Sequence, residues 1–372
     1  MKITKKPILV GLFSLFLIGL TTLFTLYSTI GGSVAQIVVT APPAATSTPF
    51  VPTPAPDPDA AFGVLLLGFR GDGSKGGYLS DTMMVGLVEP KKQSISLISI
   101  PRDLWVKLPI SDNEERYFKI NHAFAVGVDN KLFPNKLPQY QGPGGGGQLA
   151  KKIVEEATGL NIPYFVAVNF NGFTKTIDTL GGIDVNVTRA FEDKYFPIAG
   201  MEDDSCGKSE SEMKALEATI SGYLLEQQYG CRFEILTFPQ GKVTMDGNTA
   251  LKYARSRHSE TDGNDFARSE RQKQVMLAVR DKVVNIGFVT RALPFIQSLG
   301  GSVWTDIDSG VIASFMPRFQ EFRQYSVRSI NISTANALVE SRSNDRQYIL
   351  IPKTGIDNYQ SIKDFLQSEI NK

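Results

Sequence analysis

Four arginines lie close together in one stretch of the chain: Arg255, Arg257, Arg268 and Arg271. On a helix, Arg268 shares a face with Arg271 or Gln272, because positions three and four apart are neighbours. Guanidinium groups bind phosphate oxygens through paired hydrogen bonds, and a helix N-terminus, where Asp265 would lie as a cap or metal ligand, also attracts anions. The spacing therefore indicates a phosphate site, with a solvated charged helix face as the alternative.

A second set of charged residues falls at the ends of predicted buried strands. Asp81 precedes one apolar strand, and Arg102 and Asp103 follow the next. In α/β sheets, ligands bind at strand ends. The two aspartates can hold a hard cation such as Mg²⁺, and Arg102 can contact a phosphate. The alternatives are a helix or turn cap for Asp81 and a local ion pair between Arg102 and Asp103, which contributes little on a surface.

The glycine-rich run at residues 142–147 does not predict a nucleotide site. A phosphate loop of that kind continues with Lys and then Ser or Thr, whereas Gln148 and Leu149 follow here. We expect a flexible loop before a helix. The two histidines, His122 and His258, are too few for a three-histidine metal site, and we expect structural or peripheral roles for both.

The elements that would position these residues alternate between strands and helices. Apolar runs predict strands at 62–69, 82–88, 94–100, 164–170, 183–187 and 348–351. Periodic segments predict helices near 119–126, 148–158, 172–180, 248–253, 266–284, 309–319 and 359–370. This alternation predicts an α/β protein, a single three-layer α/β/α ectodomain with a central mixed sheet over residues 61–372. The polar stretch 189–240 is predicted to be an insertion in it.

The first 60 residues have a different composition. Three lysines precede an almost wholly apolar run from Ile8 to Ile30, which is long enough for a membrane helix with a cytoplasmic N-terminus. We therefore predict a cytoplasmic tip and transmembrane helix over 1–30 and a Pro/Ala/Thr-rich linker over 31–60. A cleaved signal peptide is the alternative, and both place the rest of the chain outside the cytoplasm.

The balance of charge argues against a nucleic-acid partner. The chain has 39 Lys and Arg against 38 Asp and Glu, a formal net charge of +1, whereas general nucleic-acid binders carry a large basic excess. There are two cysteines, Cys206 and Cys231. Because export exposes them to an oxidising compartment, we expect a disulfide between them, with two unrelated thiols as the alternative.

Six short motifs follow the predicted membrane helix in order. The first three are LLLG, SDTMM and SIPRD at residues 65–68, 80–84 and 99–103. The next three are KINHAF, DTLGGIDV and MDGNTAL at 119–124, 178–185 and 245–251. With the arginine-rich segment 255–272, they cover roughly residues 62–284, and the chain resembles the LytR-CpsA-Psr family of membrane-anchored wall-assembly proteins.

The resemblance implies a phosphotransferase that takes a glycan from a polyprenyl pyrophosphate carrier and attaches it to peptidoglycan through a phosphodiester. It also implies an apolar tunnel for the carrier lipid between sheet and helices, and Mg²⁺ as the cofactor. The expected partners are the lipid-linked glycan, peptidoglycan and the membrane. The protein would cross the cell membrane once, with its catalytic domain outside.

The resemblance also assigns roles to individual residues. The pyrophosphate ligands would be Arg102, Arg255, Arg257, Arg268 and Gln272. Asp81 would bind Mg²⁺, and Arg70 or Asp72 would stand where the family often carries an acidic residue after its first strand. Asp103 and Arg102 would be catalytic, with Asp103 taking the proton of the acceptor hydroxyl. Supporting roles would fall to Asp265, Lys119 and Arg271.

Such residues suit the chemistry, because arginines and Mg²⁺ stabilise charge on the transferred phosphoryl group and on the leaving phosphate. Two alternatives remain open. One is a polyprenyl-pyrophosphate hydrolase, which would use water at the same site. The other is a non-catalytic lipid-binding or regulatory wall protein, for which the aspartates would be dispensable. A protein that only binds peptidoglycan would leave the arginines unexplained.

Overall fold

The computed structural model describes residues 57, 59–71, 73, 76–259, 263, 265–285, 302–315 and 321–372. The predicted transmembrane helix, nearly all of the predicted linker and Asp72 lie outside these residues. Among the helices that are described, none combines the length and the apolar character needed to cross a bilayer. We expected a single ectodomain, but contacts within the chain separate two compact units. The first comprises Met1–Gly172 and Val289–Lys372, and the second comprises Phe173–Phe288.

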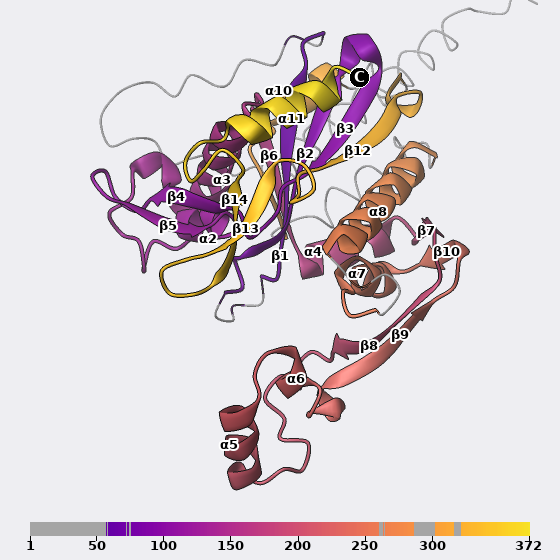
Figure 1. Ribbon diagram of the computed structural model, residues 1–372. Helices are drawn as coiled ribbons and strands as arrows, with labels where there is room; N and C mark the ends of the chain where they lie inside the picture. The colour runs from indigo at the N-terminus through magenta and orange to yellow at the C-terminus, as the bar shows by residue number, and fades with distance from the viewer. Residues whose placement is uncertain are drawn as a thin grey trace, which may run out of the picture. The chain divides into compact units, whose positions relative to one another are not determined.

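A six-stranded mixed sheet forms the centre of the first unit (Figure 1). Its strands in spatial order are β11 (Val303–Thr305), β6 (Tyr164–Asn169), β1 (Phe62–Phe69), β2 (Ser80–Glu89), β3 (Ser94–Ser99) and β12 (Ser326–Asn331). β1 is parallel to β6 and β3 is parallel to β12, whereas β2 is antiparallel to both β1 and β3, and β11 to β6. The start of β2 and the ends of β1 and β3 therefore lie along the same edge of the sheet, the edge formed by the ends of the strands.

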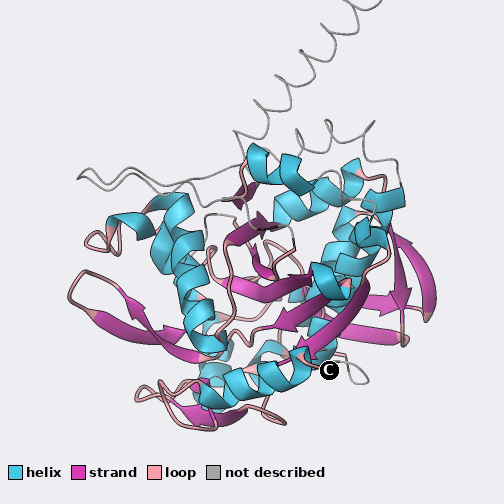
Figure 2. Cartoon of the chain, turned by 90° about the horizontal axis from the view of Figure 1, so that it is seen from above, coloured by secondary structure: helices cyan, strands magenta, loops and turns pink. Residues whose placement is uncertain are grey.

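Alternation along β1 explains how helices cover both faces of this sheet. Leu65, Leu67 and Phe69 are buried on one face, in the core shared with α2 (His122–Val128), α3 (Gly142–Thr158) and α11 (Gln360–Ile370). Phe62 and Val64 point to the other face, where they pack against α10 (Ser309–Phe315). Seen from above, helices flank the central strands (Figure 2). The α/β class and the mixed sheet are thus confirmed.

The glycine run that we expected to be a loop forms the first turns of α3, so this prediction was wrong. Close packing explains why the glycines are helical. A Cβ atom on Gly147 would lie 2.2 Å from the ring of Phe165, and one on Gly127 of α2 would lie 2.4 Å from the Cα of Gly146. The tight approach of α2 and of β6 to α3 therefore overrides the low helix propensity of glycine.

Two hairpins and three short turns complete the described part of the first unit. β4 (Trp105–Pro109) pairs antiparallel with β5 (Glu115–Lys119), and β13 (Leu338–Arg342) pairs with β14 (Tyr348–Pro352). The 3₁₀ turns are η1 (Pro90–Lys92), η2 (Pro138–Tyr140) and η5 (Glu321–Arg323). Lys119 ends β5, so the helix that we expected from residue 119 begins instead at His122.

The second unit is built on a small two-stranded antiparallel sheet covered by helices. β7 (Ile183–Val187) pairs with β10 (Gly241–Met245), and α8 (Asp265–Asn285) packs on β7 and on α7 (Gly247–Arg255). α4 (Phe170–Thr179) leads into this unit along the chain. The carboxylate of Asp246 caps α7 by accepting the N–H of Thr249 at 2.7 Å. Tyr253 and Val275 are buried where α7 and α8 meet.

Residues 189–240, the predicted insertion, form a protrusion of the second unit that we call the arm. β8 (Phe191–Pro197) and β9 (Phe233–Phe238) make an extended hairpin that carries α5 (Glu210–Thr219), α6 (Tyr223–Glu226) and the turn η3 (Gly230–Arg232) (Figure 1). Neither α5 nor α6 has a buried residue. Because these two helices bury no apolar residue, the part of the arm that carries them depends more on covalent closure.

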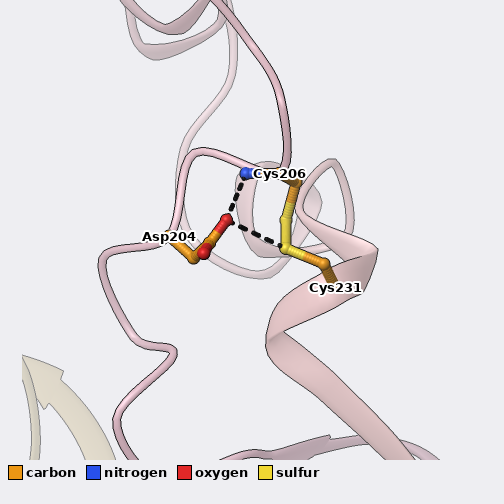
Figure 3. Close-up of side chains that lie close together, drawn as sticks. All are labelled: Asp204, Cys206 and Cys231. Carbon is orange, nitrogen blue, oxygen red and sulfur yellow. Dashed lines mark hydrogen bonds between the residues drawn. A yellow bond between two sulfur atoms is a disulfide. The ribbon is translucent and has the colours of Figure 1, made fainter.

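A disulfide between Cys206 and Cys231 closes the arm and confirms the expected pairing (Figure 3). The two Cα atoms lie 5.6 Å apart. The carboxylate of Asp204 accepts the backbone N–H of Cys206 at 2.7 Å. Asp204 and the two sulfurs are close enough together to resemble a metal site. Because both sulfurs are used in the disulfide, neither is available as a thiolate ligand.

Candidate active site

Four charged side chains of the first unit form a continuous row of ion pairs, which we call the charged row. Arg102 Nη1 donates to Asp81 Oδ1 at 2.8 Å, and Arg102 Nε lies 3.6 Å from Asp103 Oδ2. Lys119 Nζ donates to Asp103 Oδ1 at 2.7 Å. Asp81 is 45% exposed, whereas Asp103 is 14% exposed. The row therefore runs from an open carboxylate to a largely buried one.

Backbone hydrogen bonds bring the segments of the charged row together. The N–H of Asn121 donates to the carbonyl of Arg102 at 3.3 Å, and the N–H of Ser80 donates to the carbonyl of Asn121 at 3.1 Å. The N–H of Leu350 donates to the carbonyl of Asp103 at 2.9 Å. Three motifs that are distant in sequence thus meet at the sheet edge where β2 begins and β3 ends. Asp81 and Arg102, placed at this edge from the sequence, do meet there.

His122 lies beside the row as a neutral packing residue. Its ring is 5.4 Å from the ring of Phe118, and its Nδ1 is 2.9 Å from Asn121 Oδ1. Burial lowers the pKa of His122, although a hydrogen bond with the backbone of Lys119 opposes the shift. The neutral, packed ring fits the structural role expected for it.

In the second unit, a fully buried carboxylate organises the loop that follows α7. Asp193, on β8, has no exposed surface. Its Oδ2 accepts the hydroxyl of Ser256 at 2.7 Å and the N–H groups of Arg257 and His258 at 3.1 Å each. Burial tends to raise the pKa of Asp193, but the hydrogen bonds from Ser256 and the backbone outweigh it and hold that pKa below its usual value. The sequence did not point to Asp193, because it lies in a polar stretch with no informative spacing.

Arg271 has a structural position rather than an open one. Its side chain is 1% exposed. Its Nε donates to the carbonyl of Tyr253 at 3.2 Å, its Nη2 donates to the carbonyl of Ser256, and its guanidinium lies 4.7 Å from the ring centre of Phe191. Arg271 therefore fixes the end of α7 against α8.

The remaining predicted ligands of the second unit lie around the contact between α7 and α8. Arg255 is the last residue of α7, and its guanidinium carbon is 5.3 Å from the ring centre of Phe196. Gln272 Nε2, on α8, donates to the carbonyl of Ala254 at 3.5 Å. Arg257 is exposed and Arg268 is partly exposed on α8. The first residue of α8 is Asp265.

Contacts with the arm extend to this loop. The ring of Tyr223, on α6, stacks on His258 with centroids 5.1 Å apart. His258 Nδ1 lies 3.2 Å from the carbonyl oxygen of Tyr195 on β8. His258 thus packs against the arm, as a peripheral residue would.

The charged row has ligands that suit Mg²⁺. Mg²⁺ is commonly held by one or two carboxylates together with substrate phosphates and water. Asp81 offers a half-exposed carboxylate of which one oxygen accepts from Arg102. Within the part of the chain that the structure describes, neither Asp81 nor Asp103 belongs to a group of three potential ligands. The charged row therefore offers one open carboxylate, that of Asp81, of the type that binds Mg²⁺.

A separate pocket of about 530 Å³ in the first unit contains none of the predicted site residues. It is lined by residues 111–113, 134–138 and 141. Lys136 on its wall is 2% exposed and donates to the carbonyls of Val126 and Gly127 at 2.5 and 2.6 Å. Burial lowers the pKa of Lys136 to about 8, against the opposing charge of Asp129. Lys136 thus caps the last turn of α2.

Comparisons with known proteins identify relatives of this chain. A TagU polyisoprenyl-teichoic acid–peptidoglycan teichoic acid transferase of Oceanobacillus iheyensis is 28% identical over 260 residues, which are 70% of this chain and 63% of that protein. A transferase of the same name from Bacillus subtilis is 29% identical over 247 residues, 66% of this chain and 60% of that protein. The match thus spans less than two thirds of the length of these two relatives.

The crystal structure of Bacillus subtilis TagV has the same fold. It aligns with a TM-score of 0.54 and 23% sequence identity, over 84% of this chain and 98% of that one. The model of the LytR_cpsA_psr family matches residues 36–363 of the chain. This range includes both the charged row and the arginine-rich segment 255–272. The protein belongs to the LytR_cpsA_psr family.

Proposed function

We propose that this protein is a membrane-anchored, extracytoplasmic phosphotransferase that moves a glycan from a polyprenyl pyrophosphate carrier onto peptidoglycan. Family membership and the names of its transferase relatives support the reaction class. The observation that carries the proposal is the charged row. In it, the phosphate-binding guanidinium of Arg102 lies between an open carboxylate suited to Mg²⁺, Asp81, and a shielded carboxylate suited to a proton, Asp103.

The positions of Asp81, Arg102 and Asp103 in the charged row define the role of each residue in the proposed chemical step. A hydroxyl oxygen of the acceptor sugar bonds to the phosphorus next to the donor glycan, and the bond from that phosphorus to the bridging oxygen breaks. Polyprenyl phosphate leaves with the bonding electrons, and the hydroxyl proton passes to Asp103. Lys119, 2.7 Å from Asp103, fixes the orientation of that carboxylate. Arg102 stabilises the charge that develops on the phosphoryl oxygens.

The family resemblance assigns further phosphate ligands to residues of α7, of α8 and of the loop between them. By that resemblance Arg255, Arg257, Arg268 and Gln272 would be pyrophosphate ligands, with Asp265 in a supporting role. Asp193 and Arg271 bind no phosphate themselves, because both are buried and their polar atoms bond to the loop. They hold the loop in the conformation that presents the ligands.

Mg²⁺ would be held by Asp81, with Asp72 as a further ligand. When bound, the ion would neutralise charge on the phosphate oxygens. Asp81 has the open, half-exposed carboxylate that such binding needs. Arg102 donates a hydrogen bond to one oxygen of Asp81. This contact positions the proposed metal ligand, Asp81, next to the proposed phosphate ligand, Arg102.

The carrier lipid and the membrane anchor complete the proposal. Leu66, Val166 and Val168 present half-buried apolar side chains on β1 and β6. An apolar sheet face of this kind suits a polyprenyl chain. The apolar run Ile8–Ile30 would anchor the protein beside the membrane that holds the carrier.

The proposal is tested with the full chain in detergent micelles, a polyprenyl pyrophosphate donor with a labelled glycan, Mg²⁺ and peptidoglycan. We expect label in the peptidoglycan fraction with the wild type and not with Asp103→Asn. Soluble labelled sugar phosphate without labelled peptidoglycan would instead identify a hydrolase. Full cell-wall function of Asp81→Ala in cells would favour a non-catalytic role.

A further inference from the structure

The β4–β5 hairpin presents an exposed aromatic and basic face beside the charged row. Trp105 lies opposite Lys119, and Lys107 lies opposite Tyr117. Residues paired across an antiparallel hairpin, and residues two apart along a strand, share a face. Trp105, Lys107, Tyr117 and Lys119 therefore form one outward surface, which we call the hairpin surface.

Two aromatic rings dominate the hairpin surface. The rings of Trp105 and Tyr117 are nearly parallel, with 6° between their planes and centroids 6.0 Å apart. Tyr117 is 37% exposed and Trp105 is partly exposed. The opposite face of β4 packs into the core through Val106 and Leu108, which are fully buried. The core contacts of the hairpin thus come from the other face, and the ring pair remains open to a ligand.

A charged residue outside the hairpin, Asp357, holds Tyr117 and Lys107 in place. Asp357 accepts the hydroxyl of Tyr117 at 2.5 Å and lies 3.0 Å from Lys107 Nζ. Lys107 Nζ is also 5.3 Å from the centre of the Tyr117 ring. A ligand that stacks on the Tyr117 ring therefore does not have to order that ring first, which favours binding.

The hairpin surface joins the charged row through Lys119. Lys119 contacts Asp103, and beyond Asp103 come Arg102 and then Asp81. A ligand on the rings would reach Asp103 from the side of Lys119, whereas a phosphate would lie towards Arg102. This order separates a surface for the acceptor from a surface for the pyrophosphate.

We propose that the hairpin surface binds the glycan strand of peptidoglycan and directs a sugar hydroxyl to Asp103. The inference rests on the proposed transferase function and names the surface that its acceptor uses. Sugar rings have C–H faces that pack on aromatic rings and hydroxyl edges that need polar partners. Trp105 and Tyr117 supply the rings, while Lys107 and Lys119 supply hydrogen-bond donors beside them.

The test measures binding of a soluble, uncrosslinked peptidoglycan tetrasaccharide to the full chain in micelles, by calorimetry and without donor. We expect Trp105→Ala and Tyr117→Ala to weaken binding about tenfold or more, as loss of an aromatic anchor does. Trp105→Phe should restore most of the affinity because it keeps a ring. Leu132→Ala, a change at a residue 73% exposed, should bind as the wild type does. Equal affinity of Trp105→Ala and wild type, or no binding by the wild type, would overturn the proposal.

Transfer kinetics supply a second measurement that separates acceptor from donor. Trp105→Ala and Tyr117→Ala should raise the KM for peptidoglycan and leave the KM for the lipid-linked donor unchanged, whereas Trp105→Phe should stay near the wild type in both. A rise in the donor KM alone would overturn the assignment. If the wild type binds the tetrasaccharide through Trp105 yet transfers no label, the hairpin surface is supported while the transferase proposal fails.

Discussion

The carboxylate of Asp193 accepts a 2.7 Å hydrogen bond from the hydroxyl of Ser256, which lies 63 positions later in the chain. The same oxygen also accepts the N–H groups of Arg257 and His258. One buried side chain at the base of the arm thus sets the conformation of the loop after α7. Arg255 and Arg257 flank Ser256. This contact therefore fixes the backbone positions from which both arginine side chains extend.

Asp193→Asn should lower both stability and phosphate affinity. The amide nitrogen of asparagine would face donors rather than acceptors, and an unsatisfied buried polar group costs about 1–3 kcal/mol. We expect a lower urea unfolding midpoint and weaker pyrophosphate binding. Glu192→Gln is the matched control, since Glu192 is the neighbouring residue with a side chain 47% exposed. Equal behaviour of the two variants would show that Asp193 does not hold the loop.

Asp81→Asn should abolish most transfer without unfolding the protein. The pair of Asp81 with Arg102 is partly exposed, and such pairs contribute about 0–1 kcal/mol to stability. Loss of a preorganised electrostatic contact at a reacting group costs roughly 10²–10³ in rate. Asp184→Asn is the control, because Asp184 also forms a half-exposed ion pair, at 3.0 Å with Lys242. A transfer rate near that of the wild type in Asp81→Asn would remove Asp81 from the site.

His122 should make stability depend on pH. Burial lowers its pKa below the usual 6.5 in the folded state. As the pH falls through about 6.5, the unfolded chain binds a proton that the folded chain does not, so the wild type loses stability. His122→Gln should remove this contribution, which is at most about 1.4 kcal/mol per pH unit. Urea unfolding at pH 5, 6, 7 and 8 tests the prediction, and parallel curves for the two proteins would contradict it.

Gly147→Ala should destabilise the protein although alanine favours a helix. The new methyl group would lie 2.2 Å from the ring of Phe165, which is fully buried. Overpacking of this kind costs about 1–3 kcal/mol, more than the 0.5–1 kcal/mol that alanine gains in a helix. Gly230→Ala, where no atom lies within 4 Å of the added Cβ, should stay near the wild type. The thermal unfolding midpoints of both variants test this prediction, and equal midpoints for the two would contradict it.

Sequence patterns predicted the parts of the fold that depend on local order. Apolar runs located β1, β2, β3 and β6, and the position of Asp81 and Arg102 beside strand ends placed them at one edge. The glycines at 142–147 were misread, because their helical conformation depends on Phe165 and on α2, which are contacts between distant segments. Local propensity carries no information on such contacts.

The site was predictable where charge was concentrated and unpredictable where a single buried group acts. Arg102 and Asp103 are adjacent in sequence, so the ion pair of Asp103 with Lys119 only extended a visible cluster. Asp193 is one acidic residue in a polar stretch, and only tertiary packing brings it to Ser256. Lys119 was expected in a helix but lies at the end of β5. There it is paired with Trp105 across the hairpin, and its Nζ donates a hydrogen bond to Asp103.

The central claim is that this chain transfers a lipid-linked glycan to peptidoglycan with the charged row. The most direct measurement follows a labelled glycan from polyprenyl pyrophosphate into peptidoglycan, using the full chain with Mg²⁺ and comparing wild type with Asp103→Asn and Arg102→Ala. We predict labelled peptidoglycan and stoichiometric polyprenyl phosphate with the wild type, and a large loss of both products with each variant. Label that stays on the lipid, or peptidoglycan labelled equally by wild type and variants, would contradict the account.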